Sequence, residues 1–227
     1  MNKRILVLSL LASGGLLLSG VSSAQLNLKQ FGIGGGDSSA NAGAGASSGG
    51  VSQLLQTYVG ANQQVLSGQS SLASAMGLSG AAGQAQQAAG LLSGGTPSVS
   101  QLTQVGSTQQ SLSQTLTQAF ASRASGDASA TPVNKQAFTD GLTSLGKGVS
   151  QYSSLQSGLG SIGQMNPSSL LQSGLNPQTA QSASYIAKSA PGQLQSLMST
   201  LSSAVQFASS HGISVPSIAT AALKGGQ

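Results

Sequence analysis

The sequence predicts a mostly α protein: an irregular up-and-down helical bundle, preceded by a signal peptide and a flexible arm rich in Gly, Ala and Ser. Two observations support this fold class. Apolar residues recur at steps of three and four along several stretches, and the alternation typical of strands is nearly absent. We therefore divide the chain into a signal peptide (residues 1–24), an arm (residues 25–50) and an α-helical bundle domain (residues 51–227).

Residues 1–24 have the pattern of an export signal. Lys3 and Arg4 give a positive head, residues 5–18 an apolar segment, and Val21-Ser22-Ser23-Ala24 a cleavage site of small residues. The apolar segment is shorter than the roughly 20 residues that a membrane-spanning helix needs. We expect cleavage after Ala24 and export to the periplasm, the cell surface or the medium; an uncleaved membrane anchor is the alternative.

Residues 25–50 show neither a helical nor a strand period. Glycines cluster at 32–36 and again towards residue 50, with Ala, Ser and Asn between them. Such a composition gains too little from burial to offset the entropy of the chain. We interpret this segment as a flexible arm.

The first strong helix is predicted from Val51 to Met76. Asn62 and Gln69 occupy two positions of its stripe, and the apolar residues of the stripe are Val51, Leu55, Tyr58, Val65, Leu72 and Met76. Apolar residues beside this line widen it beyond a two-helix seam, which favours a bundle. A weaker helix of small residues is predicted at 81–92.

Two further helices are predicted from prolines that follow threonine. Thr96-Pro97 precedes a face formed by Val99, Leu102, Val105, Leu112, Leu116 and Phe120. Thr131-Pro132 precedes the central helix, residues 133–159, whose stripe is Phe138, Leu142, Leu145, Val149 and Tyr152. A threonine hydroxyl can cap free backbone N–H groups, and proline needs no amide partner at the first helical position.

The central helix also contains Gly141, Gly146 and Gly148. Each glycine costs about 1 kcal/mol relative to Ala in a helix interior. Either a neighbouring helix packs closely against these glycines, or the helix is marginal.

The C-terminal third shows two more pairs of a capping residue and proline. Asn166-Pro167 predicts a single turn and Asn176-Pro177 a helix, which we expect Pro191 to kink or restart. The apolar stripe then continues through Leu194, Leu197, Leu201 and Val205. We expect Gly212 to end this helix and residues 216–223 to form a last short one.

Charge is sparse: only 5% of residues are charged, and the chain contains no cysteine. Removal of residues 1–24 would leave six scattered cations against three carboxylates. This is too few for the clustered phosphate contacts of a nucleic-acid-binding protein. Without cysteine the chain also lacks disulfides and a lipid-modified N-terminal cysteine.

Few side chains are suited to chemistry. Asp37, Asp127 and Asp140 are the only acids, at spacings that form no local acid–base pair, and His211 is the only histidine. His211 is either a base or metal ligand, or a cation-capable residue at a helix C-terminus before Gly212. We assign no catalytic, cofactor-binding or metal-ligating residue and expect no enzyme.

These features predict an exported, non-enzymatic protein that acts through its surface. We expect a structural or interaction component of the bacterial envelope or extracellular matrix, with a protein partner or self-association, because an uncharged surface does not repel its own copies. The alternatives are a periplasmic carrier of an apolar ligand and a membrane-active bundle, since contact with a membrane is left open although no spanning helix is expected in the mature chain.

Overall fold

The computed structural model describes residues 48–124, 132–163, 167–172 and 174–225; the expected signal peptide and residues 25–47 of the expected arm lie outside them. Over these ranges the chain forms seven helices and no strand, which confirms the mostly α prediction. The helices are α1 (Ser48–Ala75), α2 (Ser79–Gly90), α3 (Val99–Ala124), α4 (Lys135–Gly163), α5 (Pro167–Gln172), α6 (Pro177–Ser210) and α7 (Ser217–Gly225).

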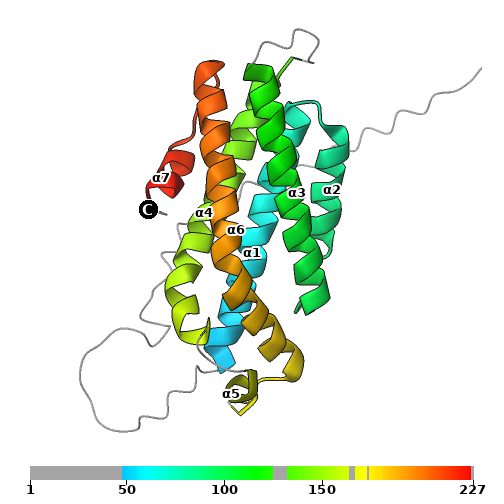
Figure 1. Ribbon diagram of the computed structural model, residues 1–227, viewed down its shortest axis with the longest axis vertical. Helices are drawn as coiled ribbons and strands as arrows, with labels where there is room; N and C mark the ends of the chain where they lie inside the picture. Colours follow the sequence, from blue (N-terminus) through cyan, green and yellow to red (C-terminus); the bar gives the residue numbers. More distant parts are fainter. Residues whose placement is uncertain (1–47, 125–131, 164–166, 173, 226–227) are drawn as a thin grey trace, which may run out of the picture. The chain divides into compact units, whose positions relative to one another are not determined.

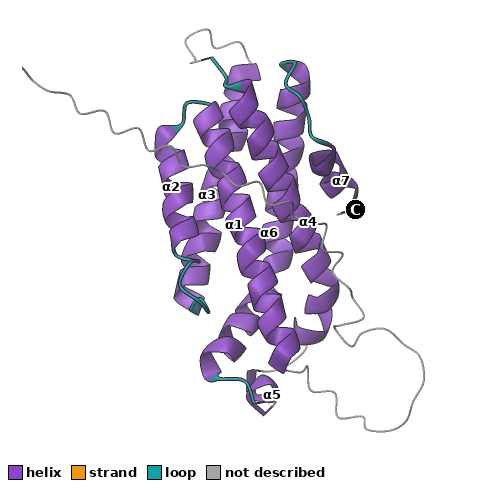
Figure 2. Ribbon diagram, turned by 180° about the vertical axis from the view of Figure 1, so that it is seen from behind, coloured by secondary structure: helices purple, strands orange, loops and turns teal. Residues whose placement is uncertain are grey.

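The described helices form a bundle in which α1, α3, α4 and α6 run lengthwise beside one another (Figure 1). The chain runs up α1, down α2, up α3, down α4 and up α6, as an up-and-down bundle does. Helix α2 packs against α1 and α3, whereas α7 packs against α4 and α6 on the opposite side (Figure 2).

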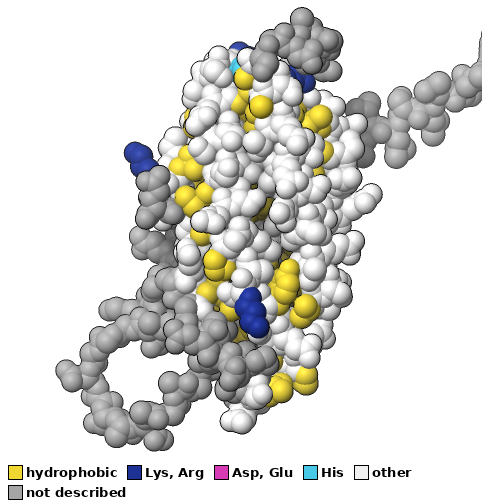
Figure 3. Space-filling model, viewed as in Figure 1, with side chains coloured by type: hydrophobic (Ala, Val, Ile, Leu, Met, Phe, Trp, Pro, Cys, Tyr) yellow, Lys and Arg dark blue, Asp and Glu magenta, His cyan; other side chains and the backbone are white. Residues whose placement is uncertain are grey.

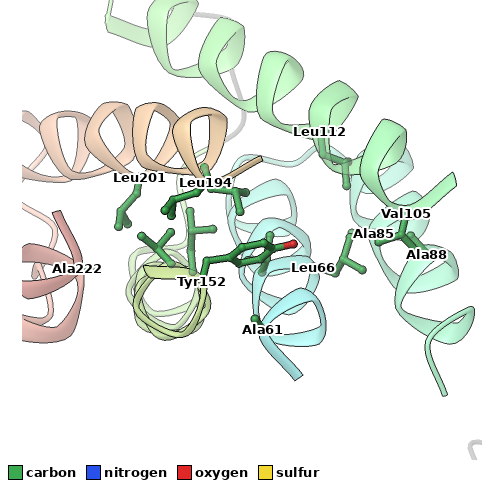
Figure 4. Packing of buried hydrophobic residues seen from close by; sticks show 14 of the residues in the cluster. Ala61, Leu66, Ala85, Ala88, Val105, Leu112, Tyr152, Leu194, Leu201 and Ala222 are labelled. Carbon is green, nitrogen blue, oxygen red and sulfur yellow. The ribbon is translucent and has the colours of Figure 1, made fainter. Parts of the chain in front are cut away.

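The core fills the space between these helices with aliphatic and alanine side chains (Figure 4). Three phenylalanines, from α3, α4 and α6, meet near one end of the bundle: ring centroids are 5.7 Å apart for Phe120–Phe138, 5.3 Å for Phe120–Phe207 and 5.4 Å for Phe138–Phe207. Aromatic groups at such separations stabilise by more than their area alone. They join the three helices at this end.

Three glycines of α4, Gly141, Gly146 and Gly148, lie where other helices approach its backbone closely. A Cβ at Gly141 would lie 2.9 Å from the backbone N of Leu72 in α1, and one at Gly148 would lie 3.0 Å from that of Val65. A Cβ at Gly146 would lie 2.9 Å from the Cα of Ala219 in α7. These distances leave no room for a side chain, so close packing accounts for the glycines.

Helix α1 contributes a matching glycine. A Cβ at Gly68 would lie 2.6 Å from the backbone N of Leu145 and 2.9 Å from its Cα. Glycines on both helices therefore let the α1 and α4 backbones touch.

The starts of the helices confirm one predicted cap and correct two. The Asn176 side chain accepts a hydrogen bond from the Thr179 amide at 2.8 Å, with Pro177 next to it, as predicted. Helix α3 is instead capped by Ser98, which exchanges hydrogen bonds with Gln101 in a capping box.

Helix α4 begins at Lys135, not at Pro132 as predicted. The Asn134 side chain accepts from the Ala137 amide at 3.1 Å, and the Asn134 amide donates to the Ala75 carbonyl at the end of α1. Thr131 lies outside the described residues.

The start of α1 also differs from the predicted border between the arm and the first helix. Residues 48–50, expected in the arm, belong to the helix. Val51, the first apolar residue of the predicted stripe, is fully buried within this helix.

Helix α6 continues through Pro191, so the chain does not restart there; its N-terminal part diverges from the direction of its C-terminal part (Figure 1). Buried Ala190 and Leu194 flank the proline and hold the helix against the bundle. The helix ends at Ser210, and Gly212, two residues later, has φ +61° and stops it as predicted.

Candidate functional site

The described structure brings together two polar features: an amide-rich seam buried between α1 and α3, and the exposed face of α3 above it. In the seam, the Gln109 Nε2 donates to Asn62 Oδ1 at 2.7 Å, and the Asn62 Nδ2 donates to the Tyr58 carbonyl at 2.8 Å. The Gln69 Nε2 donates to the Ser113 hydroxyl at 3.0 Å and to the Gln109 carbonyl at 3.2 Å. All four side chains of this seam (Asn62, Gln69, Gln109 and Ser113) are buried.

The seam fixes how α3 sits on α1. A shift of α3 by one turn would separate the amides and leave buried donors without acceptors, at about 1–3 kcal/mol each. Among the described residues, two acceptors of the seam, Gln69 Oε1 and Gln109 Oε1, have no hydrogen-bond partner. Polar groups of this kind favour one register over alternatives at some cost in stability.

A second polar group, partly buried, joins α1, α4 and α6. The hydroxyls of Tyr58 and Tyr152 both donate to Gln193 Oε1, at 2.7 and 3.0 Å, and their rings meet edge to face with centroids 5.5 Å apart. Burial raises the pKa of the Tyr58 phenol and raises that of Tyr152 well above its usual value. Both tyrosines therefore act as neutral donors.

The outward side of α3 is polar and uncharged. Its exposed residues before the last turn are Ser100, Thr103, Gln104, Ser107, Gln110, Ser111, Gln114 and Gln118. Figure 3 shows this face beside α6, where the apolar and basic side chains are scattered.

A shallow groove lies on each side of α3. The groove towards α2 has a volume of about 530 Å³; α3 lines it with Gln104, Ser107, Thr108 and Ser111, and α2 adds two glutamines, Ala88 and Leu91. The groove towards α6 has a volume of about 360 Å³ and is lined by Ser113, Gln114, Thr117, Gln118, Ser196, Ser199 and Thr200. No lining residue of either groove is charged, and nearly all carry an amide or a hydroxyl.

Two of the described cations bind helix C-termini. The Arg123 guanidinium donates to the Met76 carbonyl at 2.6 Å, and the Lys135 ammonium donates to the Gly212 carbonyl at 3.3 Å. Cations at these positions satisfy free carbonyls and oppose the helix dipole. Asp140 is exposed and accepts from Gln136 at 3.0 Å.

His211 is the C-cap of α6. Its ring stacks on Phe207 with centroids 3.9 Å apart, and its Nδ1 lies 2.9 Å from the Phe207 carbonyl and 3.0 Å from the Ser210 hydroxyl. Of the two interpretations of this histidine, the geometry fits the helix-terminal one. Over the described residues, no three His, Cys, Asp or Glu side chains gather as metal ligands, and no helix is long and apolar enough to cross a membrane.

The stripe residues named from the sequence lie in the core with two exceptions. The buried ones are Val51, Leu55, Tyr58, Val65, Leu72, Met76, Leu102, Val105, Leu112, Leu116, Phe120, Phe138, Leu142, Leu145, Val149, Tyr152, Leu194, Leu197 and Leu201. Val99 and Val205 are only half-buried. Ala204 and Ala208 occupy the core positions in this part of α6. Val205 lies one residue beyond Ala204, and each step along a helix rotates the side-chain direction by about 100°, so Val205 faces partly away from the core.

Sequence reasoning missed the partners in the seam. Gln109 occupies a gap in the α3 stripe just as Asn62 and Gln69 do in α1, and this shared gap was the signal that could have paired the two helices. Gln193 follows Pro191 with no pattern that points to the tyrosines.

No protein-family model, curated protein or solved structure matches this chain.

Proposed function

We propose that this chain is an exported, non-enzymatic protein that works through its uncharged surface, as a self-associating structural or interaction component of the bacterial envelope or extracellular matrix. The observation that supports it most is the pair of grooves beside α3, whose linings contain no charge. Amides and hydroxyls both donate and accept hydrogen bonds, so such a surface is complementary to a copy of itself.

The sparse charge supports the same proposal. Soluble proteins usually keep apart by surface charge, and the described residues offer one acid, Asp140, and five cations. Close approach of two copies then costs little Coulomb energy.

The two alternatives have less support. The grooves hold few apolar side chains, Ala88 and Leu91 among them, whereas carriers line their sites mainly with apolar groups. Co-purification of an apolar molecule, detected by native mass spectrometry, would favour the carrier. Release of vesicle contents by micromolar protein would favour the membrane-active bundle.

Fractionation of the source culture tests the export part of this proposal. We expect an epitope-tagged chain in the periplasm, on the cell surface or in the matrix, with a mass that matches cleavage after Ala24. The matched control starts with Met followed by Gln25 and should stay in the cytoplasm. A full-length chain found in the cytoplasm at its uncleaved mass would contradict the proposal.

A further inference from the structure

We propose that the N-terminal segment of α6, residues 177–190, opens away from the bundle as one unit, on a hinge at Pro191 and Gly192, while the rest of the bundle stays folded. This inference is independent of the self-association proposed above. An opened segment presents an apolar side that the closed structure covers, because Ala183 and Ile186 are buried. The hinge residues, the packing on either side of them and the polar contacts of the segment support it.

The hinge lies where the backbone of α6 is least supported by its own hydrogen bonds. Pro191 has no amide hydrogen to donate to the Ala187 carbonyl, so the helix lacks one hydrogen bond at this point. Gly192 follows, and glycine favours a helix less than any residue except proline. Both hinge residues are exposed, and no atom lies within 4 Å of the position of a Cβ at Gly192. A bend at these two residues therefore breaks few contacts of their own, and the two parts of α6 already run in different directions (Figure 1).

The two parts of α6 differ in how much apolar surface they bury. The buried residues of the N-terminal segment are mostly small: Thr179, Ala180, Ser182, Ala183, Ile186 and Ala190. Those beyond the hinge include three leucines and a phenylalanine: Leu194, Leu197, Thr200, Leu201, Ala204, Phe207 and Ala208. Ile186 is the one large aliphatic side chain buried in the segment, and Tyr185 beside it is half-buried. Because stabilisation scales with the apolar area buried, the segment is held less firmly per residue than the rest of the helix.

The C-terminal part of α6 is fixed to the bundle directly after the hinge. Gln193 Oε1 accepts the hydroxyls of Tyr58 and Tyr152, at 2.7 and 3.0 Å, and so ties α6 to α1 and α4. Further along, Phe207 packs in the cluster of three phenylalanines at the end of the bundle. The motion therefore ends at the hinge, and the part of α6 beyond it stays in place.

Two hydrogen bonds join the segment to the connection between α2 and α3. The Ser182 hydroxyl donates to the Pro97 carbonyl at 2.9 Å, and the Gln178 Nε2 donates to the Thr96 carbonyl at 3.2 Å. Water replaces such partners when the segment opens, so each bond favours the closed state only modestly. The two bonds act as a latch that keeps the closed state dominant.

Native-state hydrogen exchange of residues 25–227, resolved by amide with NMR at urea concentrations below unfolding, tests the proposal. We expect the amides of residues 181–190 to share one opening free energy and to exchange about tenfold or more faster than those of residues 197–208, after correction for intrinsic rates. Their exchange should also depend weakly on urea, because a short segment exposes little surface when it opens. The amides beyond the hinge should show the steep dependence of unfolding of the whole bundle.

Two variants separate the opening of the segment from unfolding of the bundle. Ser182→Ala removes the buried bond to Pro97, which is broken in both openings, so it should speed exchange of both sets of amides about threefold to tenfold. Gly68→Ala disturbs the contact between α1 and α4, which stays intact when only the segment opens. It should therefore speed exchange of residues 197–208 and leave residues 181–190 unchanged.

Ser203→Ala is the matched control, because the Ser203 hydroxyl donates to the Ser199 carbonyl within α6, at 3.0 Å, and its loss should change both sets little. Three results would overturn the proposal. Equal exchange and equal urea dependence of the two sets would show that α6 opens only with the whole bundle. Exchange that slows steadily from residue 181 inwards would show fraying of a helix end without a hinge. Faster exchange of residues 181–190 in Gly68→Ala would show that the two sets share one opening.

Discussion

The close contact between α1 and α4 can be tested by adding one methyl group to Gly68. A Cβ at this position would meet the backbone of Leu145, with 2.6 Å to its N and 2.9 Å to its Cα. Backbone atoms cannot rotate away as a flexible side chain can, so the two helices must separate. Gly60, two turns earlier in the same helix, has no atom within 4 Å of the corresponding position and serves as the matched control.

The two substitutions should therefore change stability in opposite directions. Gly60→Ala removes a poor helix former and should stabilise the fold by about 0.4–1 kcal/mol. Gly68→Ala gains the same propensity but overpacks a tight contact, which costs roughly 1–3 kcal/mol, and the backbone clash places it in the upper half of that range. We expect Gly68→Ala to be net destabilising by about 1–2 kcal/mol, and the two variants to differ by roughly 2–3 kcal/mol.

Urea unfolding followed by far-ultraviolet circular dichroism measures both free energies at one protein concentration. A lower midpoint for Gly68→Ala and a higher one for Gly60→Ala would support the contact. Equal stabilisation by both substitutions would refute it, because it would show that α1 and α4 have room for a side chain at Gly68.

Three other predictions follow from the described contacts. Gly146→Ala should push α7 off α4 and speed hydrogen exchange in α7, whereas Gly192→Ala, with open space around it, should not. Replacing Asn176 by Ala should cost about 0.5–2 kcal/mol in unfolding free energy, and replacing it by Ser much less, because serine also caps. Burial raises the pKa values of Tyr58 and Tyr152 above 10.0, so their stabilising contribution is complete below pH 10 and is lost as the pH rises through the raised values. Urea midpoints should therefore fall above pH 10, less steeply in Tyr152→Phe, and a flat profile would contradict this.

The buried side of a helix was predictable wherever the residue spacing within that one helix determines it. The spacing of Val51, Leu55 and Tyr58 defines a buried side whatever helix covers it, and so does that of Phe138 and Leu142. Helix starts were less predictable. A threonine–proline pair and a polar residue one or two positions after it compete for the same free amides, and Ser98 and Asn134 cap the helices in the structure.

The rest depends on contacts between helices, which a single sequence does not encode locally. From the sequence, the glycines of α4 indicated either close packing by a neighbouring helix or a marginal helix. The close approach of α1 and α7 to these glycines decides for close packing. Pro191 lies inside one continuous helix because buried neighbours outweigh its missing hydrogen bond. The α3 face was predictable as polar and uncharged, but its flanking grooves follow from where α2 and α6 lie.

Self-association through an uncharged surface is tested most directly by sedimentation velocity of residues 25–227 over a wide concentration range, at low and at high salt. We expect the average sedimentation coefficient to rise with concentration and to change little with salt, because screening acts on charges and not on amide and hydroxyl contacts. A single monomer coefficient at every concentration would contradict the proposed function, and association that high salt abolishes would show that charge, not the uncharged surface, holds the copies together.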